Sequence, residues 1–132
     1  MGTKADFYIG LHRPRWIGSV HAAGEPWNIP CIILIQNNKP LYEEHVVDFI
    51  TSMDGVVKSM GEEWPWQWET SQLTEYSYYF SNRHRKVLAY SREDNIVFEP
   101  LKIMQGEDLK SAKSVRSIKF PMMGVGYGPD IT

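Results

Sequence analysis

Histidine and cysteine are the residues of this chain most able to catalyse a reaction or bind a metal, and their spacing matches no common signature. Neither a His-x-His nor a His-Glu-x-x-His spacing occurs among the four histidines, His12, His21, His45 and His84. A single cysteine, Cys31, cannot build a zinc signature, and after Pro30 at the head of an apolar run we expect a buried, unreactive thiol. We therefore predict no catalytic residue, no metal site and no cofactor.

Residues 62–69, Glu-Glu-Trp-Pro-Trp-Gln-Trp-Glu, carry the most unusual pattern. Pro65 favours an extended, polyproline-like backbone, in which alternate residues point the same way. The three indoles could then form a platform for stacking on a partner, and the glutamates an acidic rim. This predicted surface consists of Trp64, Trp66, Trp68, Glu62, Glu63 and Glu69. The alternative is that the rings fold back and close the open end of the core.

A second candidate site is cationic and lies in two predicted turns. Arg13 and Arg15 belong to the first turn, and Arg83 and Arg85 to the second. The guanidinium group binds phosphate or carboxylate through two parallel hydrogen bonds. If both turns lie at one end of the sheet, they would form the mouth of a ligand site. The alternative is a pair of ordinary polar hairpin turns without a ligand.

The first half of the chain predicts a hairpin followed by a long helix. Residues 5–11 and 15–21 have the aromatic and β-branched content of two strands, and residues 22–30 form an irregular loop. The apolar run 31–35 fits either a short strand or a helical turn. Apolar residues then recur at helical spacing, which predicts one amphipathic helix from residue 39 to residue 60, capped by Asn37 or Asn38 and continuing through Gly55.

The second half predicts a linker over residues 62–72 and a hairpin from strands 73–80 and 86–91. Residues 95–98 fit a further strand in meander order, and residues 115–120 a last one. We expect an α+β fold, with an antiparallel sheet of about four to five strands and one long amphipathic helix on one face. Residues 1–132 should form a single domain in which 121–132 are a flexible tail.

Charge and composition narrow the function classes. The net charge of −2 argues against general nucleic-acid binding, which needs clustered cations. Residues 41–80 hold eight acidic residues and one basic residue, Lys58, so this region could attract a basic protein surface. Neither a signal peptide nor a membrane-spanning run is recognisable. With one cysteine, these features predict a cytoplasmic protein without a membrane partner.

Several short motifs resemble those of a set of small uncharacterised proteins of bacteria and their phages, over roughly residues 5–90. They are Asp6-Phe-Tyr-Ile-Gly, Trp16-Ile-Gly-Ser, Trp64-Pro-Trp-Gln-Trp-Glu and Thr74-Glu-Tyr-Ser-Tyr. The resemblance implies no activity and transfers no functional residue. It implies a small accessory protein in a bacterial or infected bacterial host cell, a setting in which host-directed inhibitors and anti-defence proteins are frequent.

We therefore expect a small non-enzymatic binding protein that acts by protein–protein interaction through its acidic, tryptophan-rich surface. Self-association as a homodimer is compatible with exposed aromatic residues. One alternative is a protein that binds and sequesters a nucleotide or another phosphorylated small ligand, with the four arginines on phosphate and a Tyr or Trp on the base. The other is a hydrolase that uses His21, His45 or Glu63.

Overall fold

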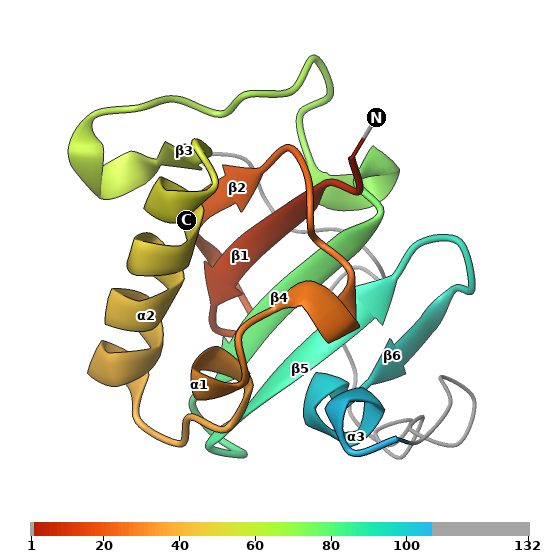
Figure 1. Ribbon diagram of the computed structural model, residues 1–132. Helices are drawn as coiled ribbons and strands as arrows, with labels where there is room; N and C mark the ends of the chain where they lie inside the picture. The colour runs from red at the N-terminus through yellow and green to blue at the C-terminus, as the bar shows by residue number, and fades with distance from the viewer. Residues whose placement is uncertain (1, 107–132) are drawn as a thin grey trace.

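A six-stranded mixed sheet organises the part of the chain that the computed structural model describes, residues 2–106 (Figure 1). Its strands lie in the order β3-β2-β1-β4-β5-β6. They are β1 Ala5–Ile9, β2 Arg15–Val20, β3 Val56–Val57, β4 Tyr76–Ser81, β5 Lys86–Ser91 and β6 Ile96–Phe98. The helices are α1 Cys31–Leu34, α2 Lys39–Ser52 and α3 Pro100–Met104, and the 3-10 turns are η1 Pro26–Asn28, η2 Lys58–Met60 and η3 Ser71–Leu73.

Both predicted hairpins and the meander strand are confirmed, but a purely antiparallel sheet is wrong. β1 pairs antiparallel with β2, and β4 with β5, which in turn pairs with β6. β1 and β4, however, run parallel, with Ala5 beside Tyr76 and Ile9 beside Phe80. The chain leaves β2 and enters β4 at the same end of the sheet, so β4 must run in the direction of β1. The count of four to five strands also missed β3, a two-residue strand on the edge beside β2.

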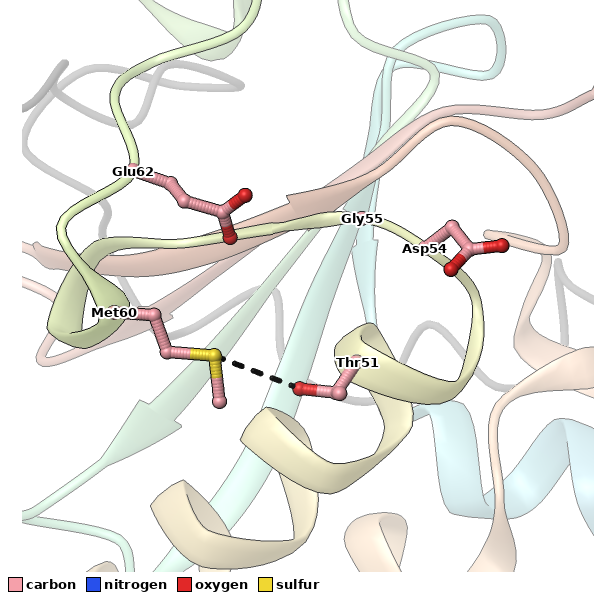
Figure 2. A pocket seen from close by; sticks show the side chains of 5 residues that line it. All are labelled: Thr51, Asp54, Gly55, Met60 and Glu62. Atoms are coloured by element: carbon pink, nitrogen blue, oxygen red, sulfur yellow. Dashed lines mark hydrogen bonds between the residues drawn. The ribbon is translucent and has the colours of Figure 1, made fainter.

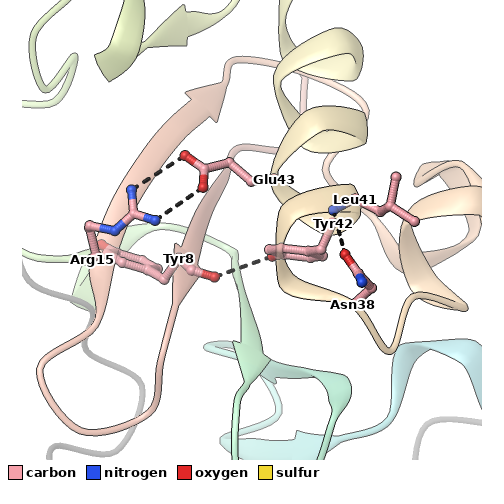
Figure 3. Close-up of polar contacts among 6 residues, drawn as sticks. All are labelled: Tyr8, Arg15, Asn38, Leu41, Tyr42 and Glu43. Carbon is pink, nitrogen blue, oxygen red and sulfur yellow. Dashed lines mark hydrogen bonds and ion pairs between the residues drawn. The ribbon is translucent and has the colours of Figure 1, made fainter.

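Helix α2 begins where the sequence predicted. Asn38, of the two asparagines considered, caps it: its side-chain oxygen accepts a hydrogen bond from the Leu41 backbone N–H at 3.0 Å (Figure 3). This bond satisfies one of the backbone donors that a helix leaves free in its first turn. The apolar stripe buries Tyr42, Val46, Phe49 and Ile50.

The predicted extent of this helix to residue 60 is wrong, because α2 ends at Ser52. Asp54 adopts a φ of 56°, and the Gly55 N–H turns back to the Ile50 carbonyl at 2.9 Å. A Cβ on Gly55 would lie 2.3 Å from the Ser19 carbonyl oxygen, so the backbone presses against β2. The chain therefore leaves the helix and continues as β3 and then η2. The Thr51 hydroxyl donates a hydrogen bond to the Met60 sulfur at 4.0 Å (Figure 2).

The two faces of the sheet carry different side chains, as the alternation of a strand requires. One face packs against α2 through a core that includes Phe7, Ile17, Tyr78 and Phe80. The opposite face buries the second cluster, which consists of Tyr8, Trp16, Tyr79, Leu88, Tyr90 and Val97, and Trp64 packs against it. The predicted platform is therefore placed beside the face that α2 does not cover.

Three further predictions differ from the structure or lie beyond it. The run after Pro30 is the short helix α1, in which Ile33 and Leu34 are buried while Cys31 is exposed, so the expected burial of the thiol is wrong. Cys31 and Ile33 lie two positions apart, roughly 200° around a helix of about 3.6 residues per turn, so they point to nearly opposite sides. The predicted strand 115–120 and the tail 121–132 lie outside the described residues.

Within residues 2–106, no helix is long and apolar enough to span a membrane.

Candidate binding surface

A buried carboxylate, Asp6, lies at the centre of the site. It points from β1 onto the face opposite α2 and is fully buried. Its Oδ1 accepts hydrogen bonds from the Ser19 hydroxyl at 2.5 Å and the Trp66 indole at 2.7 Å, and its Oδ2 accepts from the Ser71 hydroxyl at 2.6 Å. Burial raises the pKa of Asp6, and the hydrogen bonds from Ser19, Ser71, Trp66 and Thr74 act in the opposite direction.

The hydrogen bonds extend outward from Asp6 to three more aromatic residues. The Trp16 indole donates to the Ser19 hydroxyl at 3.0 Å, and the Trp68 indole donates to the Thr74 hydroxyl at 3.0 Å. The hydroxyls of Tyr8 and Ser71 lie 2.6 Å apart. One polar network thus ties β1, β2 and η3 to residues 64–68. Such a network fixes a single arrangement of its members, because each alternative leaves a buried polar group without a partner.

The three indoles of residues 64–68 do not form one flat row. Trp66 and Trp68 stack, with ring centroids 5.5 Å apart and planes 13° from parallel. Trp64 instead meets Trp16 edge-on at 5.3 Å, and its N–H donates to the backbone carbonyl of Trp68. All three side chains are partly buried. Each indole N–H donates a hydrogen bond within the protein, and part of each side chain remains accessible to solvent.

Exposed polar residues alternate with the indoles along this segment. Glu63, Gln67 and Glu69 are exposed, and we call these residues together with Trp64, Trp66 and Trp68 the tryptophan surface. The Lys4 ammonium lies 5.9 Å from the centroid of the Trp66 ring, and the His21 ring meets the same indole edge-on at 5.1 Å. Aromatic rings attract cations, and so do the exposed carboxylates that neighbour them in the sequence.

Glu62, the remaining glutamate of the predicted rim, has a structural contact. Its Oε1 accepts a hydrogen bond from the Val57 backbone N–H at 2.8 Å. The residue also lines an open pocket of about 460 Å³ together with Thr51, Asp54, Gly55 and Met60. In Figure 2, Asp54 and Glu62 lie on either side of Gly55. Glu62 therefore helps to hold the segment that leads to the tryptophan surface.

The structure places both arginine-bearing turns at one end of the sheet. β1 and β4 run in parallel to that end, and the Gly10 N–H beyond β1 donates to the Phe80 carbonyl at 2.8 Å. Arg13 and Arg85 are exposed there, as is Arg83. Arg15 instead points toward α2 and forms a two-bond ion pair with Glu43, at 3.1 and 3.3 Å (Figure 3).

The arginine turns and the tryptophan surface are not brought together. Trp66 and Trp68 bond to Asp6 and Thr74, at the start of β1 and just before β4, whereas the turns follow the ends of these strands. Strands of this length separate the two sites by roughly 15–20 Å. One mononucleotide therefore does not reach from the arginines to the stacked indoles, so a base contact in the predicted nucleotide site would need another Tyr or Trp.

Of the predicted hydrolase residues, His45 is separated from the other two. His21 follows β2 and contacts Trp66, whereas His45 belongs to α2, on the other face of the sheet. Glu63 is exposed on the tryptophan surface. Among residues 2–106, His, Cys, Asp and Glu form no group of three or more that could hold a metal ion.

Asp6 and its hydroxyl partners were missed by the sequence analysis. Asp6 alternates with Tyr8 on one side of a strand, so a buried position for this carboxylate could have been suspected. No sequence signal indicates that Ser19, Ser71 and Trp66 meet it.

Comparison with known proteins finds no matching family model, no matching curated protein and no matching solved structure.

Proposed function

We propose that this protein is a small non-enzymatic binding module that recognises a basic segment of a partner protein through the tryptophan surface. The observation that carries the proposal is the Trp66–Trp68 stack, which is fixed from inside by the indole N–H bonds to Asp6 and Thr74 and is partly exposed outside.

Preorganisation makes such a surface effective. The indole donors of Trp66 and Trp68 are already used, so binding requires no new partner for them and freezes few side-chain rotations. An aromatic face attracts Lys and Arg, and Lys4 already lies over the Trp66 ring. The exposed carboxylates of Glu63 and Glu69 add charge complementarity, which speeds association with a cationic partner.

The resemblance to small bacterial and phage proteins suggests a cellular location and a class of role for this binding module. A preorganised surface with aromatic and acidic side chains suits an inhibitor or adaptor that occupies a basic site of a host protein. We propose the bacterial cytoplasm, or that of an infected cell, as the place of action, and anti-defence as the class of role.

A charge-reversal experiment tests the proposed surface. The variant Glu63→Lys/Glu69→Lys changes two exposed side chains and leaves every indole hydrogen bond in place. Binding of a synthetic Arg-rich decapeptide, followed by tryptophan fluorescence at low salt, should weaken by about tenfold. The matched control is Glu44→Lys/Glu93→Lys, which makes the same change in net charge at exposed positions on α2 and in the β5–β6 turn.

The control should bind the peptide nearly as the unchanged protein does. Equal losses in both variants would show that overall charge alone governs binding, and absence of peptide binding by the unchanged protein would reject the proposal. Trp66→Ala is a poorer test, because it removes one of the hydrogen bonds to buried Asp6 and so disturbs the fold.

A further inference from the structure

The parallel pairing of β1 with β4 brings two turns of distant sequence side by side. Ile9 lies beside Phe80 in the register, and the Gly10 N–H donates to the Phe80 carbonyl at 2.8 Å. Adjacent strands are separated by about 4.8 Å, so side chains from the two turns can contact one ligand together. We call His12, Arg13, Arg83, His84 and Arg85, all exposed, the arginine end of the sheet.

This end carries a concentrated positive charge. Residues 9–15 and 81–87 contain no Asp or Glu. The nearby carboxylates of Glu43 and Glu99 pair with Arg15 and Lys86, at 3.1 and 3.0 Å. Among the described residues, none of the ion pairs involves the three arginines of the arginine end. Their guanidinium groups are therefore open to an anion from outside.

Arg85 adopts a backbone conformation that does not favour an arginine. Arg85 has a φ of 52°, a left-handed conformation that costs an arginine more than an asparagine or a glycine. The β5–β6 turn has the same design, since the Ser81 and Ser91 hydroxyls accept hydrogen bonds from the His84 and Asp94 backbone N–H groups. At the equivalent position the second turn has Asn95, with a φ of 54°.

We infer that the arginine end binds the oligophosphate chain of a small ligand. Several guanidinium groups on neighbouring turns suit consecutive phosphate groups, each of which can accept two parallel hydrogen bonds. The stacked indoles lie at the opposite end of β1 and β4, so recognition rests on the phosphates and requires no contact between Trp66 or Trp68 and a base. This site is independent of the tryptophan surface and of the partner proposed for it.

The internal comparison with Asn95 supplies the test. Arg85→Asn copies the residue of the equivalent turn, so thermal unfolding should show a midpoint equal to or above that of the unchanged protein. In calorimetric titrations at low salt, its affinity for inorganic triphosphate should fall about fivefold, and that of Arg83→Gln/Arg85→Asn should fall further. Arg92→Gln, in the β5–β6 turn, is the matched control and should bind normally.

Three further binding measurements show whether the phosphate chain, the nucleoside or the tryptophan surface is responsible for binding. Adenosine triphosphate should bind as well as inorganic triphosphate, adenosine should not bind, and Glu63→Lys/Glu69→Lys should retain triphosphate binding. Absence of triphosphate binding at millimolar concentration, or unchanged affinity in Arg85→Asn, would overturn the inference. So would binding of a DNA duplex by a protein that ignores triphosphate, because the partner would then be a nucleic acid.

Discussion

The indole of Trp66 donates a hydrogen bond of 2.7 Å to the carboxylate of Asp6, a residue sixty positions earlier in the chain. Asp6 is fully buried in β1, whereas the side chain of Trp66 is partly exposed on the tryptophan surface. The bond therefore connects the interior of the fold to its proposed binding surface. A change at Asp6 should alter both stability and the order of the indoles.

Two substitutions of Asp6 should differ in cost. Asp6→Ala removes the acceptor of the Ser19, Ser71 and Trp66 donors and should lower the free energy of unfolding by about 3 kcal/mol. Asp6→Asn keeps one carbonyl oxygen, and its NH₂ can donate to Ser71, whose hydroxyl can turn toward Tyr8. Its cost should be about 1 kcal/mol. Urea denaturation followed by circular dichroism measures both, and a loss in Asp6→Ala no larger than that expected for Asp6→Asn would show that the network does not stabilise the fold.

The stability of the protein should depend on the ionisation of Asp6. Burial raises its pKa in the folded state above the ordinary value of 3.8, so folding favours the protonated carboxyl. This contribution is fully present below pH 3.8 and is lost as the pH rises through the folded-state pKa. The free energy of unfolding of the unchanged protein, minus that of Asp6→Asn, should therefore fall with rising pH across this interval. Urea denaturation at a series of pH values tests it; a difference that stays level or rises would contradict the assignment.

Gly55 and Gly61 should respond differently to alanine. A Cβ on Gly55 would lie 2.3 Å from the Ser19 carbonyl oxygen and 2.7 Å from Ile50 Cγ2, so Gly55→Ala should destabilise the fold by about 3 kcal/mol. Gly61 has a φ of 80° and no atom within 4 Å of the added Cβ, so Gly61→Ala should cost about 1 kcal/mol, from the backbone conformation alone. Thermal unfolding of the two variants gives the comparison, and a smaller effect at Gly55 would mean that β3 can move away from β2.

The sequence predicted most of the local structure and much less of its assembly. Both hairpins, the meander strand and the start of α2 were found because turn residues and side-chain alternation act over a few positions. The end of α2 was missed: the apolar stripe kept its helical phase past Gly55, but the close contact with Ser19 forces the chain out of the helix. The sequence also indicated that Trp64, Trp66 and Trp68 form a distinctive segment, but it did not show that Trp66 and Trp68 stack while Trp64 packs against Trp16.

By itself, the amino-acid sequence determined where most strands and turns form. It also places three tryptophans and three glutamates in residues 62–69, and arginines in the two hairpin turns. The tertiary structure decided that β1 and β4 run parallel, which places the two arginine turns together and the tryptophan surface at the opposite end. The physical reason is the range of the interactions. Hydrogen bonds within a turn involve neighbours, whereas the choice of a partner strand, and of the donors around Asp6, depends on burying residues some sixty positions apart in one core.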